Sequence, residues 1–498
     1  MKITLISLDQ MIISYGLRLI SSCLKKDGHE VEMIFARAVI GRPLPADVEN
    51  QVVRLCQSSD LIGISLMSNH FPQAISLTQK IKKKLNVPII WGGVHPTFCP
   101  EESLKYADMV CLGEGEESML RLVKRMKAGQ EITKTPGIWF KKNGEIIKNE
   151  TESLVGDLDS LPFPDFGPEG HFIRDGRKVK KMTKDLFEKF LTKRETPNGE
   201  FVAEYYISTS RGCPFRCAYC ASNTIKNLYH GQRFFRLRRP EKVIEEVKTL
   251  VDKFNFIKWI YFADDDLLAS PIERIKIFCY FWKKEIDLPF YATVAPWSYS
   301  EEKLRLFLDA GLGIINMGIQ TVSKRGVRVY HRLAPKKKLR EITSSIHKLK
   351  LPMPPLYDFI LDNPYESDKD RLENLDFILK IPKPRKFQLF SLVPFPGTEI
   401  YTRMKNDGLL TDEEKMIYQK SYSYPEANYI NMLTYLANTD FPTSVVKLLR
   451  GRIFLFLFNN KVSKWLFKKI PYSAFLILAR NLFNLRFWRF NIKPKGEF

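Results

Sequence analysis

The sequence predicts an α/β protein with two successive parallel sheets and a helical C-terminal region. Two observations lead to this fold class. Residues 1–150 alternate short apolar strands with amphipathic helical segments, and a second alternation of the same kind begins at Glu204. A change of composition after residue 440 marks the tail. We therefore expect domains at 1–150, 201–405 and 406–498, with a connector at 151–200.

The first alternation predicts a doubly wound, flavodoxin- or Rossmann-like sheet, which binds its ligand at the carboxyl ends of the strands. Helical segments such as Tyr15–Lys26 and Phe71–Leu85 carry apolar residues at three- and four-residue spacing. A hairpin is expected over Gly137–Asn149, because Asn143-Gly144 favours a tight turn. The five expected strands are Lys2–Ser7, Val31–Phe35, Leu61–Leu66, Val87–Trp91 and Met109–Leu112.

The connector begins with Leu161-Pro-Phe-Pro-Asp165, where the prolines exclude regular helix or strand. The basic stretch Arg174–Arg194 that follows is interpreted as a solvated surface insertion. The second alternation then predicts a parallel, partial (β/α)6 barrel of the TIM type, with its site at the carboxyl ends of the strands. Its six expected strands are Tyr205–Thr209, Lys258–Ala263, Phe290–Val294, Ile314–Gly318, Leu356–Leu361 and Phe387–Leu392. Its expected helices include Glu241–Lys253, Ile272–Lys284 and Glu301–Ala310.

Three of the eight cysteines, Cys213, Cys217 and Cys220, lie within eight residues after the first strand of this barrel. In a chain of this length without a secretory signal, such a group indicates metal binding rather than disulfides. Iron–sulfur clusters usually have four cysteine ligands, so three thiolates would leave one iron open to another ligand. A zinc site is the alternative, but structural zinc needs a fourth ligand, and His230 and Cys279 show no such pairing.

The segment Ser208–Cys220 resembles the signature of the radical SAM superfamily, C-x-x-x-C-x-aromatic-C after the first barrel strand. The resemblance implies a 4Fe–4S cluster held by Cys213, Cys217 and Cys220, whose open iron binds S-adenosylmethionine (SAM). Reductive cleavage of SAM would give a 5′-deoxyadenosyl radical, with electrons from a donor such as flavodoxin or ferredoxin. By the same resemblance, Tyr219 would pack near the adenine.

Two later strand ends also match the superfamily pattern. The segment Phe262–Asp266 closes the second barrel strand, where the resemblance implies polar groups that bind the methionine amine of SAM. Asp264 and Asp265 are the candidates, and a helix N-cap is the alternative role. Gly318-Ile-Gln-Thr321 resembles the usual G-[IV]-E-[ST], so Gln320 and Thr321 are candidate SAM ligands although Gln320 replaces an acid.

Two further segments match less closely. Asp362-Asn-Pro-Tyr-Glu366 stands where relatives carry a Gly-x-Pro-Gly-Glu turn, and both glycines are missing here. Pro394-Phe-Pro-Gly-Thr398 matches the segment after the sixth strand, and a simple turn is its alternative interpretation.

The α/β domain ahead of this barrel resembles the cobalamin-binding domain of class B radical SAM methyltransferases. Three strand ends carry the likeness: Gly63–Met67, Trp91–Pro96 and Cys111–Glu117. Glycines at such positions let a corrin or its nucleotide tail approach the backbone closely. With the loop after the first strand, the resemblance gives these candidate cobalamin contacts: Tyr15, Gly16, Ser65, Met67, Gly92, Gly93, Val94, Gly113, Glu114 and Gly115.

Cobalamin domains with an axial histidine carry D-x-H-x-x-G after the first strand. Here that loop reads Asp9-Gln-Met-Ile-Ile-Ser-Tyr-Gly16, and no histidine precedes His29. We therefore expect cobalt to have no protein imidazole below it. His95 is interpreted as a structural residue at a strand end.

The two resemblances imply a methyltransferase that acts on an unactivated carbon. In the family scheme one SAM methylates cob(I)alamin, and a second SAM gives the radical that removes a substrate hydrogen. The substrate radical then receives the methyl group from methylcobalamin. The alternative is an oxidative cyclisation or rearrangement that uses the same cofactors without methyl transfer.

Two other functions are disfavoured. Methylthiotransferases need a second three-cysteine set in the N-terminal domain, but the cysteines there lie on different elements: Cys23, Cys56, Cys99 and Cys111. A non-enzymatic cobalamin or redox sensor has only the altered turn Asp362–Glu366 in its favour, against an intact cluster loop.

The last 58 residues, 441–498, carry twelve Lys or Arg side chains against one acid, which is half of the formal charge of +22. Apolar groups such as Phe454–Phe458, Trp465–Phe467 and Phe475–Leu478 alternate with these basic residues and are too short to span a bilayer. They fit helices that lie in the membrane interface. We expect a cytoplasmic enzyme with peripheral contact to the inner membrane face and a hydrophobic or lipid-like small-molecule substrate.

The alternative for the tail is an ordinary helical cap on the barrel. No nucleic-acid partner is expected, because the tail's aromatic side chains occur in apolar clusters rather than singly among the charges.

Overall fold

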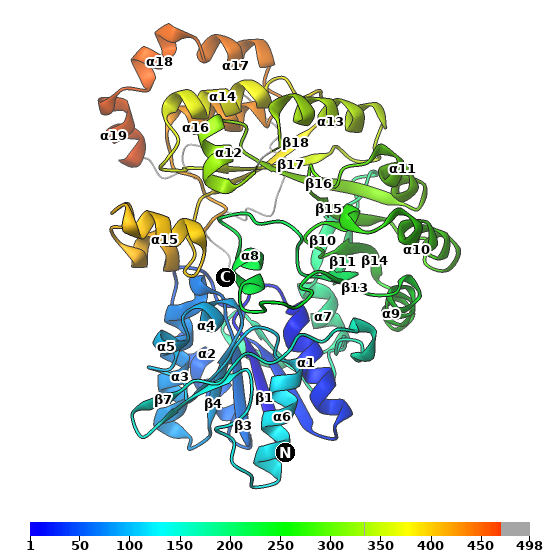
Figure 1. Cartoon of the computed structure of the whole chain (residues 1–498), viewed down its shortest axis with the longest axis vertical. Helices are drawn as coiled ribbons and strands as arrows, with labels where there is room; N and C mark the ends of the chain where they lie inside the picture. Colours follow the sequence, from blue (N-terminus) through cyan, green and yellow to red (C-terminus); the bar gives the residue numbers. More distant parts are fainter. Residues whose placement is uncertain (333, 470–498) are drawn as a thin grey trace. The chain divides into compact units, whose positions relative to one another are not determined.

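The computed structural model describes residues 1–332 and 334–469 of the chain (Figure 1). The chain divides into two units, each assembled from separate segments. The first unit comprises Met1–Ala292, Asp309–Leu312 and Pro394–Lys420, and the second comprises Thr293–Leu308, Gly313–Val393 and Ser421–Phe498.

A nine-stranded sheet opens the first unit. Its strands are β1 (Lys2–Ser7), β2 (Glu30–Phe35), β3 (Leu61–Ser65), β4 (Ile89–Gly92), β5 (Met109–Cys111), β6 (Ile138–Lys142), β7 (Glu145–Ile147), β8 (Phe172–Asp175) and β9 (Lys178–Lys181). The order across the sheet is β7-β6-β5-β4-β3-β1-β2-β8-β9. The five predicted strands are present, and they pair in parallel in the flavodoxin-like order 2-1-3-4-5. In such a sheet the ligand crevice lies at the carboxyl ends beside β1, where the strand order reverses.

Helices connect these strands, and the longer ones bury an apolar face. They are α1 (Tyr15–Lys26), α2 (Ala46–Leu55), α3 (Phe71–Lys84), α4 (Val94–Phe98), α5 (Pro100–Ser103) and α6 (Glu116–Lys127). Val48 and Val52 of α2, and Leu77 and Ile81 of α3, are fully buried at the four-residue spacing that places side chains on one helix face. Helix α1 packs against α6, and α2 packs against α3.

Two hairpins extend the sheet. The predicted hairpin is β6–β7, and its turn residues Asn143 and Gly144 have positive φ of 52° and 87°, as a primed turn requires. The second hairpin, β8–β9, comes from the basic segment that the sequence placed in a surface insertion. The lysines of β9 are mostly exposed, but β8 pairs in parallel with β2, so this segment continues the sheet.

The second sheet has the strand order β10-β11-β14-β15-β16-β17-β18. Its strands are β10 (Thr192–Glu195), β11 (Phe201–Ile207), β14 (Ile257–Phe262), β15 (Phe290–Val294), β16 (Leu312–Gln320), β17 (Leu356–Leu361) and β18 (Lys386–Ser391). The six predicted barrel strands are therefore present, and β10 adds an antiparallel partner to β11. In the first unit β11, β14 and β15 are parallel, and in the second β16, β17 and β18 are parallel.

Aromatic and aliphatic side chains fill the space between these strands and their helices. In the first unit, Phe262 packs within 5.5 Å, centroid to centroid, of Phe278, Trp282 and Phe290. The first unit also contains α7 (Lys184–Phe190), β12 (Ser210–Arg211), α8 (Ala221–Lys226), β13 (Arg236–Leu237), α9 (Pro240–Lys253), α10 (Ile272–Glu285) and α15 (Glu399–Asn406). The remaining helices are α11 (Glu301–Asp309), α12 (Lys324–Tyr330), α13 (Lys336–Lys348), α14 (Asp368–Ile378), α16 (Tyr429–Ala437), α17 (Thr443–Leu449), α18 (Arg452–Phe458) and α19 (Lys461–Lys469).

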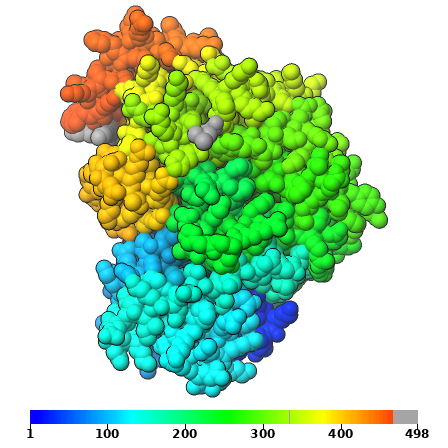
Figure 2. All heavy atoms as spheres, in the orientation of Figure 1, coloured from blue at the N-terminus to red at the C-terminus, as the bar shows by residue number. Residues whose placement is uncertain are grey.

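Helices α17 to α19 form the described part of the basic, aromatic tail and appear in orange to red on the surface in Figure 2. Several large apolar side chains there are exposed, among them Ile453, Phe456 and Trp465 at 73%, 80% and 56%. The predicted group Phe475–Leu478 lies outside the described residues. No helix within residues 1–332 and 334–469 has the length and apolarity to cross a membrane.

Candidate active site

The cysteine loop follows β11 and β12 in the first unit. Gly212 opens the loop with φ of +79°, and a Cβ there would come within 2.4 Å of the Phe234 carbonyl oxygen, so the turn requires glycine. Cys217 is buried, whereas Cys213 and Cys220 are half-buried, and none of the three is in a disulfide. Tyr219 lies half-buried in the same loop. The loop therefore presents three thiols in one short, tightly held segment.

Burial and the negative charge of Asp265 raise the pKa of Cys213 to about 12, with further contributions from Cys220 and Cys217. Burial and Asp265 also raise the pKa of Cys220. The thiolates of Cys213 and Cys220 are thus unfavourable beside Asp265. Bound iron would reverse this balance, because a coordinating metal deprotonates its thiol ligands. Three mutually coupled thiols in one loop fit a cluster with one iron left without a cysteine.

Asp264 and Asp265, the candidate SAM ligands after β14, have different surroundings. Asp264 is buried, and its carboxylate accepts bonds from the Thr209 amide at 3.1 Å, the Thr209 hydroxyl at 2.8 Å and the Ser210 hydroxyl. It therefore anchors the end of β11, from which the cysteine loop departs. Asp265 is exposed and accepts a bond from Ser222 Oγ at 3.0 Å, which leaves carboxylate oxygen accessible beside the cysteines.

Gln320 and Thr321, the candidates at the end of β16, lie in the second unit. Gln320 has φ of +70° and is half-buried, and its Oε1 has no hydrogen-bond partner among the described residues. Thr321 is fully buried and donates to Glu366 Oε1 at 2.7 Å, and Glu366 also accepts from Ser323. Asn374 joins this network through its bond from the Val322 amide. Thr321 thus belongs to an internal network, whereas Gln320 keeps an acceptor for another group.

The two turns that matched the superfamily pattern less closely are both structured. Asp362, at the place of the first glycine of the Gly-x-Pro-Gly-Glu pattern, has φ of +61°, a conformation that glycine adopts most readily. Glu366 at the end of that turn is the centre of the network around Thr321. In the segment Pro394–Thr398, the side chain of Thr398 caps α15 by accepting from the Tyr401 amide.

The candidate cobalamin contacts lie at the carboxyl ends of the first sheet. The strands themselves are buried, but Gly16 and Met67 are exposed and Ser65 and Val94 are half-buried. Gly93 has φ of +102° and ψ of −168°, a region open to glycine alone, and its Cβ would lie 2.7 Å from the Leu66 carbonyl oxygen. Gly93 therefore lets the chain pass close to the end of β3.

The third glycine loop, Gly113–Gly115, has a different environment. The hydroxyl of Tyr229 accepts a bond from the Glu114 amide at 2.8 Å and occupies the space where a Cβ on Gly113 would lie. The Glu114 carboxylate pairs with Arg211 at 3.1 Å and with Arg236. These contacts connect the glycine loop to the segment around the cysteines within the first unit. No sequence motif had indicated Tyr229, Arg211 or Arg236 as its partners.

Tyr15, the first residue of α1, lines a small cavity. The polar residues that line this cavity with it are Ser208, Arg211, Arg238 and Glu246. Arg238 donates to the Tyr15 hydroxyl at 3.5 Å and pairs with Glu246. Burial raises the pKa of Glu246 to about 7, although Arg238 opposes this shift.

The loop Asp9–Gly16 contains no histidine, but the structure brings one to it. His70, which follows β3, is buried, and its Nδ1 lies 3.7 Å from Asp9 Oδ1. Burial lowers the pKa of His70 to about 4 and raises that of Asp9 to about 6. A search for D-x-H along the chain could not find this pair, because its members are separated by 60 residues.

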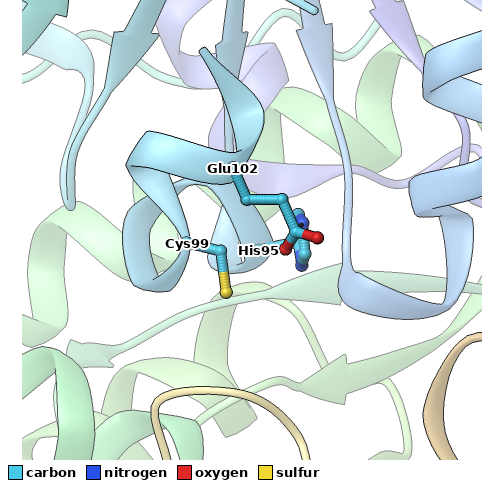
Figure 3. Close-up of side chains that lie close together, drawn as sticks. All are labelled: His95, Cys99 and Glu102. Carbon is cyan, nitrogen blue, oxygen red and sulfur yellow. Dashed lines mark ion pairs between the residues drawn. The ribbon is translucent and has the colours of Figure 1, made fainter. Parts of the chain in front are cut away.

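His95 packs as an interior residue, as the sequence suggested. Its Nδ1 lies 3.2 Å from Ser68 Oγ, and its ring lies 4.3 Å from that of Phe71. Burial lowers its pKa to about 4. The ligand atoms of His95 on α4, Glu102 on α5 and Cys99 between these helices lie within 4.8 Å of one another (Figure 3).

Comparisons with known proteins agree with this geometry. Residues 1–123 match the family model described as the B12 binding domain, and residues 207–378 match that of the radical SAM superfamily. An uncharacterised methyltransferase of Pyrococcus horikoshii is 26% identical over 71% of this chain and 71% of its own length. An anaerobic magnesium-protoporphyrin IX monomethyl ester cyclase of Cereibacter sphaeroides is 22% identical over 68% of this chain and 52% of its own.

Among solved structures, the radical SAM methyltransferase TsrM of Kitasatospora setae, with cobalamin and a 4Fe–4S cluster bound, shares the fold. Its TM-score is 0.62 at 15% identity, over 82% of this chain and 75% of TsrM. The predicted succession of a doubly wound domain and a partial barrel is thereby confirmed. With both family models matched in one chain, this protein belongs to the cobalamin-binding branch of the radical SAM superfamily, whose cofactors are a 4Fe–4S cluster, SAM and cobalamin.

Proposed function

We propose that this protein is a cobalamin-dependent C-methyltransferase that acts on an unactivated carbon of a small molecule. One observation carries the proposal: a three-cysteine loop after β11 and a sheet that matches the B12 binding domain occur in one chain. The relatives named as methyltransferases favour methyl transfer. The relative named as a cyclase makes cyclisation without methyl transfer the second candidate.

In this proposal Cys213, Cys217 and Cys220 hold the cluster, while Asp264 holds the loop against β11 through Thr209. Asp265 offers an exposed carboxylate to SAM, Gln320 offers the unpartnered Oε1 of its half-buried side chain, and Tyr219 packs near the adenine. Thr321, also a candidate SAM contact, holds the end of β16 in place through Glu366. When bound, SAM supplies both the methyl group and the hydrogen-abstracting radical, and cobalamin carries the methyl group.

The cobalamin contacts in this proposal divide into two groups. Gly16 and Met67, which are exposed, touch the cofactor directly together with Ser65 and Val94. The other candidates shape the loops around it: Tyr15, Gly92, Gly93, Gly113, Glu114 and Gly115.

The test is anaerobic incubation of the reconstituted, reduced holoenzyme with SAM. We expect about one S-adenosylhomocysteine per bound cobalamin before any substrate is added, together with slow formation of 5′-deoxyadenosine. The variants Cys213→Ala, Cys217→Ala and Cys220→Ala lose the cluster and 5′-deoxyadenosine formation, because each thiolate is a cluster ligand. Cys279→Ala, a buried cysteine on α10, is the matched control and keeps both. Formation of 5′-deoxyadenosine without S-adenosylhomocysteine would favour the cyclase reading instead.

We further propose that cobalt has no protein imidazole below it, because the loop Asp9–Gly16 lacks a histidine. Electron paramagnetic resonance of the cob(II)alamin form tests this, since an axial nitrogen splits the cobalt lines. Nitrogen splitting that disappears in His70→Ala would contradict the proposal and would identify the buried histidine beside Asp9 as the ligand.

The exposed tail helices support peripheral contact with an anionic membrane surface. Ile453, Phe456 and Trp465 expose apolar side chains, and the basic Arg452 and Lys461 lie exposed on the same helices. Such faces bind at the interface by apolar burial plus attraction to anionic lipids. A hydrophobic substrate taken from that surface is part of this proposal.

Co-sedimentation of the full chain with phosphatidylglycerol vesicles is the measurement. The double variant Ile453→Ser/Phe456→Ser should bind at least tenfold more weakly, and Tyr280→Ser, an exposed aromatic residue on α10, should bind as the wild type does. Equal binding by all three proteins, or no binding by any, would refute a role for the tail.

A further inference from the structure

A second group of possible metal ligands, separate in sequence from the cysteine loop, lies in the first unit. His95, Cys99 and Glu102 each offer a ligand atom, and these atoms lie within 4.8 Å of one another (Figure 3). The three residues are four and three positions apart, a spacing that places side chains on one face of a helical segment. We call them the His-Cys-Glu group. Its atoms combine a nitrogen, a sulfur and an oxygen.

His95 is oriented as a metal-binding histidine usually is. The residue is fully buried, and its Nδ1 lies 3.2 Å from Ser68 Oγ. Its Nε2 has no hydrogen-bond partner among the described residues, and Glu102 Oε2, at 3.8 Å, is too far for a hydrogen bond. Histidines that bind metal with one ring nitrogen almost always bond a second group with the other, which fixes the ring. Ser68 therefore leaves Nε2 free to face a ligand.

The surroundings of the His-Cys-Glu group are negatively charged. Burial and the carboxylates of Glu102 and Glu413 raise the pKa of the Cys99 thiol to about 12, while Lys405 lowers it. Lys405 lies 3.4 Å from Glu413 and thus balances the charge of one of these two carboxylates. A divalent cation would satisfy the acidic groups and let the thiol ionise, because a coordinating metal deprotonates its thiol ligands.

The segment Pro394–Lys420, which belongs to the same unit, packs against this group. The ring of Tyr418, the last residue of the short π-helix η4 (Glu414–Tyr418), lies 6.0 Å from the ring of His95. Burial and the charges of Glu102 and Cys99 raise the pKa of the Tyr418 hydroxyl. Single π-helical turns are rare and occur frequently at functional sites. The His-Cys-Glu group is therefore covered by a second segment of chain rather than left on an open helix surface.

The donor set favours zinc over the common hard cations. Zinc binds histidine nitrogen, cysteine sulfur and carboxylate oxygen, whereas magnesium and calcium take oxygen ligands. Tetrahedral bonds of about 2.0–2.3 Å separate the ligand atoms by about 3.4–3.6 Å. The distance of 3.8 Å from His95 Nε2 to Glu102 Oε2 is close to that separation. Cys99 and Glu102 are half-buried, so that solvent reaches the group.

We propose that His95, Cys99 and Glu102 bind one zinc ion through Nε2, Sγ and a carboxylate oxygen, with water as the fourth ligand. Binding releases the thiol proton of Cys99 to solvent, so the thiolate and the carboxylate together balance the two charges of the ion. The ion holds α4 and α5 together and takes no part in SAM cleavage. Since α4 begins at Val94, a candidate cobalamin contact, the zinc would also fix that end of the helix.

The test uses the full chain after anaerobic reconstitution of its cluster. The protein is incubated with one equivalent of zinc and desalted, and its zinc and iron are measured by mass spectrometry. X-ray absorption at the zinc edge should show one sulfur neighbour at about 2.3 Å and three nitrogen or oxygen neighbours at about 2.0–2.2 Å. Cys99→Ser should lose the sulfur neighbour and bind zinc at least tenfold more weakly in competition with a chelator. Glu102→Gln should also bind at least tenfold more weakly but keep the sulfur neighbour.

The matched control is Cys279→Ser, a buried cysteine of the same unit, which should bind zinc as the wild type does. Both test variants should keep the iron of the cluster. Loss of that iron in Cys99→Ser would overturn the inference by assigning Cys99 to the cluster, and so would zinc with three sulfur neighbours, which belongs to the cysteine loop. A wild type that retains no zinc, or equal affinity in the wild type and Glu102→Gln, would overturn it as well, even if Cys99→Ser failed to fold. A wild type that binds zinc but cleaves no SAM would instead refute only the proposed function.

Discussion

Replacing Asp362 by glycine tests whether a backbone preference or a set of hydrogen bonds dominates at the end of β17. Glycine stands at this place in the pattern that the turn resembles, and Asp362 has φ of +61°, which is unfavourable for an L-residue by about 1–2 kcal/mol. On this ground alone glycine should stabilise the turn. However, the carboxylate accepts three bonds of 2.7 Å, from Ser391 Oγ, Asn431 Nδ2 and the Glu426 amide.

The hydrogen bonds outweigh the strain. Ser391 and Asn431 are each 2% exposed, so water replaces their lost acceptor poorly, and each orphaned donor costs about 1–3 kcal/mol. The exposed Glu426 amide finds water and contributes little. Glycine also adds about 0.5–1 kcal/mol of backbone entropy to the unfolded chain. After subtraction of the relieved strain, we expect Asp362→Gly to destabilise the junction of β17, β18 and α16 by about 2–4 kcal/mol.

Hydrogen–deuterium exchange with mass spectrometry measures this locally in the intact protein. Amides of Leu356–Leu361, Lys386–Ser391 and Tyr429–Ala437 should exchange roughly 30- to 700-fold faster, since 1.4 kcal/mol is a factor of ten. Asp362→Asn is the matched control, because asparagine tolerates positive φ and keeps one acceptor oxygen, so its effect should be smaller. Exchange in the glycine variant that is equal to or slower than in the wild type would refute the reasoning.

Two more substitutions have clear expected outcomes. The pKa of Asp358 is about 7 in the folded protein against 3.8 for the unperturbed group, so its ionisation opposes folding increasingly as the pH rises from about 4 to 7. Asp358→Leu should therefore stabilise the second unit by about 2 kcal/mol more at pH 8 than at pH 5, measured by the same exchange method, and a pH-independent effect would contradict this. Gly93→Ala should destabilise the first sheet by more than about 2 kcal/mol and reduce bound cobalamin, because its backbone conformation is open only to glycine. Gly92→Ala should leave the fold intact, since its Cβ would meet only Cys111 Cβ at 3.8 Å, and equal losses in both variants would disprove the distinction.

The sequence predicted the elements wherever the information was local. Strand β1 and helix α1 begin and end at the residues that the apolar periodicity indicated, and β17 does so as well. The turn at Asn143-Gly144 followed from the side chains that positive φ favours. The cysteine loop was visible because its three cysteines lie within eight residues. By contrast, the strand pairing of β8 with β2 was not predictable, because the two residues that pair, Phe172 and Ile173, are too short an apolar run to indicate a strand.

The same difference between local and long-range information holds for the residues of the candidate active site. The sequence alone determined which residues form the cluster motif and the glycine-rich strand ends, because each depends on spacing along the chain. Only the tertiary structure decided the partners of those residues. Asp264 accepts a hydrogen bond from Thr209, Glu114 forms ion pairs with arginines, and Gln320 Oε1 has no hydrogen-bond partner among the described residues. It also brought Asp358 of β17 beside Asn316 of β16, across 42 residues of chain. Hydrogen bonds and burial depend on neighbours in space, and parallel strands bring together residues that a helix and two loops separate in sequence.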